Sequence, residues 1–572
     1  MHLAEGDHRR PHIGRQAGPR NPPHGAGPSS HPSHAAVTRL SPASPSLPRR
    51  QGGSLMTIRR RALLATPLAL PALLPRVAGA QADGRPVLRI AVQALPPTLE
   101  PLEAISNVGL RVTYNVFDTL WRRDFAREAR EGGRHLTPFV ATSLVQRDPL
   151  SWVAELRTDV RLQDGTLLTS ADVLSTFSAE RMWGERTQTF EGRVNFGHLA
   201  GVEAEGPHRV VFRTQSPDPV MPQRLAAYGG WIHSAAFYAA QGLDGMRRAP
   251  VGSGPYRVAS FQRDQRLVLE AHDEYWGGRP PVRQIVFTAV PEASSRLAGL
   301  HAGDYDLVTN LLPEQAESLA RHPRVEGVEV PLDFAHILYY DTRRGPLRDA
   351  RIRQGLNHAV DYDTLGRSLW GEGYRRMAAL QIPAFGELYD ADRKGFTYDP
   401  DRARRLLREG GYGGEELIIR IAPNYYLQML QAVQVIQEMW RAVGVNTRLE
   451  TRENLASVTQ PGADIRPTSI AFRFPDPLGG GLAVHLSKEY SLQRSGFWQP
   501  VRYNAIVDAL RVATAPEDRK RLWLALLDEY EAEAPALILY PVREYIGKWR
   551  DMRWSHPPLY YMDFRATNLA FG

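Results

Sequence analysis

The chain has 572 residues, 43% of them hydrophobic and 9% aromatic, which is enough for roughly three to four domains with their cores. Its formal net charge of +8 arises from residues 1–82, which hold eleven arginines and two acids, while the remainder is nearly balanced. That balance gives no support to nucleic-acid binding. Cysteine is absent, which excludes disulfides, thiolate metal sites, a cysteine nucleophile and a cysteine-linked lipid anchor.

The first segment changes character at Met56. Residues 1–55 are rich in Pro, Gly, His, Ser and Arg and lack apolar periodicity, a composition that cannot bury enough surface to fold. After Met56, three arginines at 59–61 precede an apolar run, Ala62–Leu74, which is too short to span a membrane. Small-x-small cleavage patterns follow within Ala78–Ala82.

We therefore expect residues 1–55 to be a disordered or untranslated leader, with Met56 as the true start. Residues 56–82 are expected to be a signal peptide that is cleaved on export. The arginine pattern fits both a Sec signal and a twin-arginine signal, and the sequence leaves the two open. Because no lipobox cysteine is present, the expected product is periplasmic and not lipid-anchored.

The mature part begins with a predicted strand at Pro86–Gln93. Asn107–Leu120 has apolar residues at helical spacing and predicts a helix. Leu156–Phe177 predicts a strand, then a turn at Asp164–Gly165, then a helix capped by Thr169 or Ser170.

The stretch from Ala249 to Asp306 has the most ordered pattern. It opens with a turn cluster, Val251–Tyr256, in which two glycines and a proline set the angle at which the chain enters the next strand. Alternation of apolar and polar residues then predicts three strands, and a helical period from Pro291 ends at Gly303. The strands are expected at Arg257–Phe261, Arg266–Ala271 and Arg283–Val290.

Later elements follow the same rules. Pro346–Asp361 predicts a helix, and Leu427–Trp440 predicts an amphipathic helix followed by a strand. Glu517–Tyr530 predicts a helix that Ala534–Pro535 ends, and Ala536–Tyr540 predicts a strand.

Four blocks, in their order along the chain, resemble family 5 solute-binding proteins of bacterial ABC importers. The blocks are Leu156–Phe177, Ala249–Asp306, Tyr340–Asp361 and Tyr398–Tyr412. The resemblance covers most of 86–571. It implies an α/β fold, a two-lobed periplasmic binding protein of type II (cluster C-like), with a hinge and an extra subdomain on the first lobe. The implied parts are lobe I at 86–118, 246–332 and 536–572, the extra subdomain at 119–245 and lobe II at 333–535.

The resemblance also implies a function without catalysis. The protein would bind a small polar solute, such as a short peptide or a modified amino acid, between its lobes. It would then deliver this solute to an ABC permease in the inner membrane. Such a protein needs no cofactor and no nucleic acid, and it is expected to be a monomer.

Motifs of the common catalytic and metal sites are missing from the sequence. It contains no Gly-x-Ser-x-Gly, no phosphate-binding Gly-x-x-x-x-Gly-Lys-Ser/Thr and no His-Glu-x-x-His. The histidines are scattered and predict no metal site. Two alternatives stay open: a secreted hydrolase, which would turn over its solute, and a nickel or haem carrier on the same fold.

The best candidate for solute contact is the segment from Ala471 to Pro477. In the peptide-binding members that the chain resembles, an aspartate at the position of Arg473 takes the ammonium group of the peptide. An arginine would repel an ammonium and would bind a carboxylate, a phosphate or sugar hydroxyls. The alternative is that Arg473 pairs with a nearby acid such as Asp476.

Aromatic side chains are expected to form the walls of the site, since a closing cleft needs apolar surfaces that exclude water. Trp231 follows two glycines, at a place where the backbone can approach a ligand. The full set of expected ligand-binding residues is Arg473, Asp476, Tyr114, Tyr228, Trp231, Tyr426 and Trp498.

Overall fold

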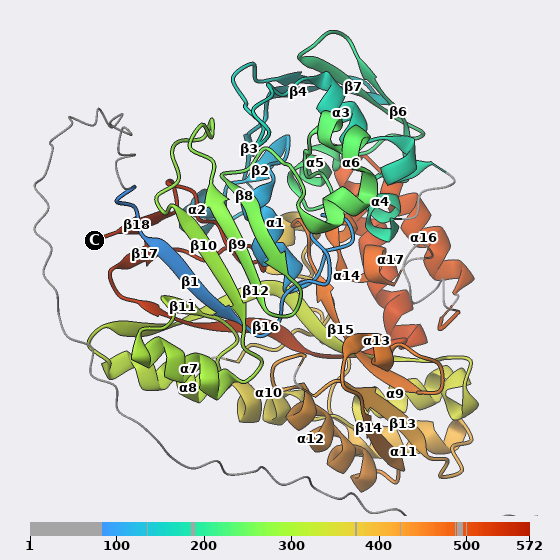
Figure 1. Cartoon of the computed structure of the whole chain (residues 1–572). Coiled ribbons are helices and arrows are strands. Elements are labelled where there is room, and N and C mark those ends of the chain that lie inside the picture. The colour runs from blue at the N-terminus through green and yellow to red at the C-terminus, as the bar shows by residue number, and fades with distance from the viewer. Residues whose placement is uncertain are drawn as a thin grey trace, which may run out of the picture. The chain divides into compact units, whose positions relative to one another are not determined.

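Ten strands form one continuous sheet, which is the frame of the fold (Figure 1). The computed structural model describes residues 83–133, 135–184, 189–371, 374–423, 425–486, 488, 496–498 and 500–572. The strand order is β14-β13-β15-β12-β16-β11-β1-β10-β9-β8. Its strands are β1 (Val87–Val92), β8 (Tyr256–Gln262), β9 (Arg266–Ala271), β10 (Gln284–Ala289), β11 (Leu307–Val308), β12 (Val325–Tyr340), β13 (Leu417–Ile421), β14 (Thr447–Thr451), β15 (Ile465–Ala471) and β16 (Ala536–Trp549).

One end of the sheet, which we call the β1–β10 region, confirms the strands predicted from alternation. β1 pairs in parallel with β10 and with β11, and β10, β9 and β8 follow as an antiparallel meander, blue beside green in Figure 1. The predicted helix after β10 is also present and ends at Gly303, whose φ of +82° is favourable for glycine. Helices of this region are α1 (Gly109–Val116), α7 (Ala293–Ala302), α8 (Pro313–Ser318) and the short η2 (Leu319–Arg321).

The other end, which we call the β13–β15 region, has helices on both faces. β13 pairs in parallel with β14 and β15, and each face of the sheet has its own apolar core. The helices predicted at 346–361, 427–440 and 517–530 are confirmed, with shifted ends. The helices are α9 (Ala350–His358), α10 (Tyr362–Trp370), α11 (Pro400–Glu409), α12 (Met429–Ala442), α13 (Leu455–Val458), α14 (Gly481–His485), α16 (Val501–Val512) and α17 (Pro516–Glu533), with η3 (Gly345–Arg348), η5 (Pro383–Leu388) and η6 (Pro477–Gly479).

Two long strands, β12 and β16, connect these regions. They pair with each other in antiparallel fashion, and β12 pairs with β15 on its other side. The pairing of β12 with β16 is interrupted between Pro331 and Ala335. The strand predicted at Ala536–Tyr540 continues to Trp549, because the residues beyond the proline at 541 pair with the first half of β12.

A separate four-stranded sheet, β4-β5-β7-β6, forms what we call the small-sheet region together with α3 to α6. It has its own apolar core, to which Val173, Phe177 and Phe212 contribute. The predicted cap of α3 is confirmed at Thr169, whose backbone N–H donates to the carboxylate of Asp172 at 2.8 Å. The elements are β4 (Ala141–Asp148), β5 (Ser151–Leu156), β6 (Leu199–Ala204), β7 (Arg209–Thr214), α3 (Ser170–Thr176), η1 (Ala179–Trp183), α4 (Phe190–Phe196), α5 (Met221–Ala226) and α6 (Ala235–Arg248).

The remaining short elements are β2 (Trp121–Arg123), α2 (Phe125–Glu131), β3 (Leu136–Pro138), β17 (Met552–Trp554) and β18 (Leu569–Phe571).

The chain divides between Ala78 and Gly79 into two units, of which the second contains every described residue. The expected leader and signal peptide lie outside the described residues. Within the described part, none of the helices combines the length and the apolar character needed to cross a membrane.

Candidate functional site

Four aromatic rings gather around Tyr561, in the C-terminal segment between β17 and β18. Tyr114 on α1 stacks on Tyr561, with ring centroids 4.2 Å apart and planes 10° from parallel. Trp231 and Tyr228 contact the same ring edge-on, at 5.9 and 6.3 Å, and Phe125 does so at 6.2 Å. Three of the expected wall residues therefore lie in one cluster, which we call the Tyr561 cluster. Sequence reasoning missed Tyr561, because nothing local distinguishes it from its neighbours Tyr560 and Met562.

The turn cluster at 251–256 positions α1, which carries Tyr114. The backbone N–H of Gly254 donates to the carbonyl oxygen of Val116 at 2.9 Å, at the end of α1. A Cβ atom at Gly254 would lie 2.6 Å from the carbonyl oxygen of Asn115, and one at Gly252 would lie 2.3 Å from that of Val116. Only glycine permits this close approach, so the turn and the helix end form one packed unit.

Gly229 places the other two rings. Its φ of +106° lies in a region that side chains rarely adopt. Gly229 lies in a turn closed by the hydrogen bond from the N–H of Gly230 to the carbonyl oxygen of Ala227 at 3.4 Å, and the rings on either side of it, Tyr228 and Trp231, both contact Tyr561. The sequence predicted that the glycines at 229 and 230 allow the backbone to approach a ligand, and this stays a prediction.

Arg473 lies in a tight loop that follows β15. Its backbone N–H donates to the carbonyl oxygen of Gly479 at 2.8 Å. Asp476 holds the loop from inside, since its carboxylate accepts the N–H of Leu478 at 3.0 Å. The same carboxylate contacts the guanidinium of Arg519 on α17, with both oxygens within 2.8 Å of Nη2. The carboxylate of Asp476 thus points toward α17, while the guanidinium of Arg473 points toward α4.

The guanidinium of Arg473 pairs with Glu191 on α4, in the small-sheet region. Arg473 Nη2 lies 2.7 Å from Glu191 Oε2, and the Arg473 side chain is only 1% exposed. Asn195, one turn along α4, contacts both partners: its Oδ1 accepts from Arg473 at 3.5 Å and its Nδ2 lies 3.4 Å from Glu191 Oε2. The guanidinium also lies over the ring of Tyr228, 5.3 Å from its centroid.

Burial dominates the electrostatics of this pair. Burial raises the pKa of Glu191 above its ordinary value, and the nearby guanidinium of Arg473 opposes that rise. Burial likewise raises the pKa of Tyr228. A buried charge pair of this kind is sensitive to any group that replaces one partner.

The Tyr561 cluster also contains a buried donor that has no acceptor among the described residues. Trp231 is 2% exposed, and its Nε1–H makes no hydrogen bond. Buried polar groups are nearly always hydrogen-bonded, so such a donor is suited to a polar group of a ligand or to a bound water molecule. Aromatic walls, an indole donor and a guanidinium together can bind a small molecule that has an apolar body and an acidic group.

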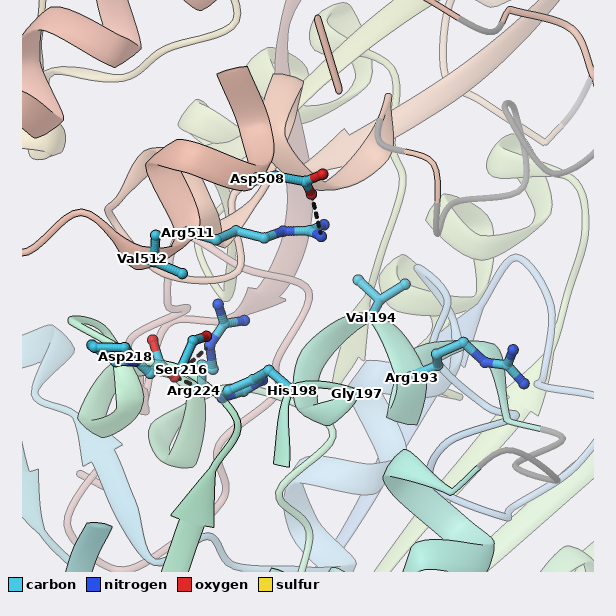
Figure 2. Close-up of a pocket in the computed structure, with 11 residues that line it drawn as sticks. Arg193, Val194, Gly197, His198, Ser216, Asp218, Arg224, Asp508, Arg511 and Val512 are labelled. Carbon is cyan, nitrogen blue, oxygen red and sulfur yellow. Dashed lines mark hydrogen bonds and ion pairs between the residues drawn. The ribbon is translucent and has the colours of Figure 1, made fainter. Parts of the chain in front are cut away.

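An open cleft of about 350 Å³ is lined by Val194 of α4 and by Gly197 at the end of this helix (Figure 2). This volume is at the lower end of the roughly 300–1,000 Å³ that is usual for small-molecule sites. Figure 2 shows Arg224, Asp218 and His198 together on one wall, with Asp508 and Arg511 of α16 on the other. Asp218 lies 2.9 Å from both Arg224 Nε and His198 Nε2. The small-sheet region and α16 of the β13–β15 region therefore face each other across this cleft.

Two expected residues lie apart from the Tyr561 cluster. Tyr426 packs against the ring of His336 at 4.8 Å, and its hydroxyl accepts the N–H of Ser469. Trp498 packs edge-on against Tyr503 on α16, in the core between the sheet and α17. In the described part of the chain, no three histidine, aspartate or glutamate side chains are grouped as metal ligands.

Comparison with known proteins gives a family match. The model of "Bacterial extracellular solute-binding proteins, family 5 Middle" matches residues 135–484. The dipeptide-binding protein of Escherichia coli K12 is 28% identical over 208 residues, which cover 36% of this chain and 39% of that protein. Heme-binding protein A of Haemophilus influenzae is 31% identical over 234 residues, covering 38% and 42%. The chain thus spans about two fifths of the length of these two relatives.

Solved structures extend the likeness over the whole fold. The periplasmic binding protein DppA of Helicobacter pylori, solved with the peptide STSA, superposes with a TM-score of 0.74. It is 19% identical and covers 85% of this chain and 98% of its own. This match confirms the expected fold, a two-lobed α/β binding protein.

Proposed function

Because this chain belongs to family 5 of the bacterial extracellular solute-binding proteins, we propose that it is the substrate-binding component of an ABC importer. It binds a small polar solute with an acidic group, such as a short peptide or a modified amino acid. It then delivers that solute unchanged to a permease in the inner membrane. The protein is exported to the periplasm by a cleaved Sec or twin-arginine signal and acts there as a monomer.

The observation that carries this proposal is the buried guanidinium of Arg473 beside the Tyr561 cluster. It lies where the β13–β15 region meets the small-sheet region. A cation at the junction of two regions can contact a solute only when those regions separate. Lobe closure around a solute is the mechanism by which such a site captures its ligand.

We assign the lobes by the boundaries that the family resemblance implies. Lobe I comprises 86–118, 246–332 and 536–572, the extra subdomain 119–245, and lobe II 333–535. The hinge lies where β12 and β16 lose their regular pairing, between Pro331 and Ala335. An irregular stretch in an otherwise continuous ladder is the place where a sheet bends most easily.

Within the site, we assign solute contact to Arg473, Tyr114, Tyr228 and Trp231. Asp476 acts indirectly, by holding the loop of Arg473 against α17. Tyr426 and Trp498 are not assigned contact with the solute, because they pack against His336 and Tyr503, apart from the Tyr561 cluster.

The decisive experiment compares wild type with Arg473→Ala and Arg473→Lys. The protein is purified from the periplasm, and native mass spectrometry identifies what it carries. The same compound is then added back to solute-free protein in calorimetry. Loss of binding in Arg473→Ala and partial retention in Arg473→Lys support the proposal. Equal affinity of all three, or release of a chemically altered compound, refutes it.

A haem or nickel-chelate carrier is the second candidate, favoured by the relative that is named heme-binding protein A. Haemin and a nickel–histidine mixture serve as competing ligands in the same calorimetry. Tight binding of either one that survives Arg473→Ala would favour the carrier.

A further inference from the structure

Glu191 and Arg473 come from parts of the chain that the resemblance assigns to different lobes. Glu191 lies on α4 of the small-sheet region, and Arg473 lies in the loop after β15. Their contact, Oε2 to Nη2 at 2.7 Å, therefore joins the two regions. The side chains are 11% and 1% exposed, so water has little access to the pair.

The carboxylate of Glu191 occupies the position beside Arg473 that the carboxylate of an acidic solute would occupy. A guanidinium binds carboxylates and other planar oxyanions through its fork of N–H groups. Glu191 already supplies such a carboxylate to Arg473, with Asn195 bridging the two side chains. A solute carboxylate and the carboxylate of Glu191 cannot both be buried here as anions without strong repulsion.

We propose that Glu191 is a specificity-determining residue: an acidic solute binds by displacing the carboxylate of Glu191 from Arg473, and Glu191 then takes up one proton. This inference rests on the proposed function. The proton comes from water, no covalent bond between heavy atoms forms or breaks, and one proton is bound for each solute. The charge of the buried site is therefore the same before and after binding.

The surroundings of Glu191 explain the proton uptake. Burial raises the pKa of Glu191, and the charge of Arg473 and the amide of Asn195 act against this rise. Among the described residues, the titratable or charged groups that interact with Glu191 are Arg473 and the phenol of Tyr228. When a solute takes Arg473, the main stabilising charge is lost and a second anion arrives, so the pKa of Glu191 rises further.

The proton uptake determines how the affinity for an acidic solute depends on pH. Since binding consumes a proton, affinity for an acidic solute increases as the pH falls from 8 toward 5. The increase stops at the pKa of Glu191 in the solute-free protein, below which Glu191 is already protonated and binding takes up no further proton. A neutral solute leaves the Arg473–Glu191 pair intact, and its affinity does not change over this range.

Three related probes test the inference by charge: N-acetylphenylalanine, N-acetylphenylalaninamide and phenylalaninamide. They share a benzyl side chain that can stack in the Tyr561 cluster, and they are respectively anionic, neutral and cationic. Calorimetry in two buffers of different ionisation enthalpy measures the protons bound per probe. The variants are Glu191→Gln and, as a matched control, Glu203→Gln, which removes an exposed carboxylate of the same region.

We expect wild type and Glu203→Gln to bind only N-acetylphenylalanine appreciably, with close to one proton taken up. Glu191→Gln removes the competing charge, so it binds this probe on the order of tenfold more tightly and takes up no proton. If Glu191→Gln folds poorly by circular dichroism, Glu191→Asp replaces it. The shorter Asp side chain keeps the charge but weakens the contact, so proton uptake persists and affinity lies between the two.

The outcomes separate the two proposals. If N-acetylphenylalanine binds and Arg473→Ala abolishes this binding, but no proton is taken up and Glu191→Gln has wild-type affinity, the inference is overturned and the proposed function stands. If all three probes bind equally or none binds, the acidic-solute assignment falls, and the inference falls with it.

Discussion

Arg519 Nη2 lies 2.7 and 2.8 Å from the two carboxylate oxygens of Asp476, and both residues are buried. Asp476 also accepts the backbone N–H of Leu478. This contact fixes the loop that carries Arg473 against α17. The position of the guanidinium in the candidate site is therefore set by an ion pair that does not touch the site itself.

Asp476→Asn should therefore destabilise the protein and loosen the site. Removing one partner of a buried ion pair costs about 3–5 kcal/mol, because the other charge is left uncompensated. Urea unfolding measures the loss. Glu438→Gln is the matched control, since Glu438 forms an exposed pair with Arg441 and such pairs contribute about 0–1 kcal/mol. Equal stability of the two variants would contradict the role given to Asp476.

Gly229→Ala should weaken solute binding by moving Tyr228 and Trp231. A side chain at a φ of +106° costs roughly 1–3 kcal/mol in backbone strain. Gly206→Ala is the control, because Gly206 has a φ of +120° in the exposed turn after β6, with no atom within 4 Å of the added Cβ. Both variants should lose stability in thermal melts, and only Gly229→Ala should lose affinity in calorimetry. A similar loss of affinity in Gly206→Ala would contradict the role given to Gly229.

Gly254→Ala should disrupt the contact between the turn cluster and α1. The new Cβ would lie 2.6–2.7 Å from backbone atoms of Asn115, Val116 and Phe117, which cannot move aside. Overpacking of this kind costs about 1–3 kcal/mol. Gly201→Ala on β6 meets no atom within 4 Å and serves as the control. Unfolding in guanidinium chloride should show a lower midpoint for Gly254→Ala alone.

Stability should rise with pH between about 3 and 6.5, partly through His336. Burial lowers the pKa of His336 to about 3, from an ordinary value of 6.5. Within this window the unfolded chain binds a proton that the folded protein does not, so stability is complete above the window and is lost as the pH falls. One such group contributes up to about 1.4 kcal/mol per pH unit.

His336→Leu tests this contribution. Neither ring nitrogen of His336 has a hydrogen-bond partner among the residues that the structure describes, so the substitution leaves none of these residues unpaired. Urea unfolding from pH 4 to 7 should show a smaller slope for His336→Leu, and an unchanged slope for His301→Leu at an exposed position. A slope equal to wild type in both variants would contradict the buried, neutral state of His336.

The local sequence pattern predicted the helices and strands well, but it did not predict which segments far apart in the chain pair with each other. The strands β8, β9 and β10 and the helix α7 match the alternation and periodicity of their own residues. The full length of β16 was missed, because its second half is specified by pairing with β12 about 200 residues earlier. Proline at 541 also reads as a strand end when only local sequence is considered.

The candidate site shows the same limit. Sequence reasoning singled out Arg473 and offered Asp476, three residues away, as a partner. The structure pairs Arg473 with Glu191, which is 282 positions away in the chain. No local signal connects two residues on separate elements, whereas covariation between positions 191 and 473 among relatives would reveal such a pair. Tyr561 was missed for the same reason.

The place of β16 in the sheet has a consequence for biosynthesis. This strand is translated about 200 residues after β12, yet it fills a central position between β12 and β11. At about 5–20 residues per second, translation needs on the order of 10–40 s to travel from the end of β12 to the start of β16. Throughout that interval a nascent chain holds β12 without its neighbour, and the sheet cannot be completed until β16 itself has been translated.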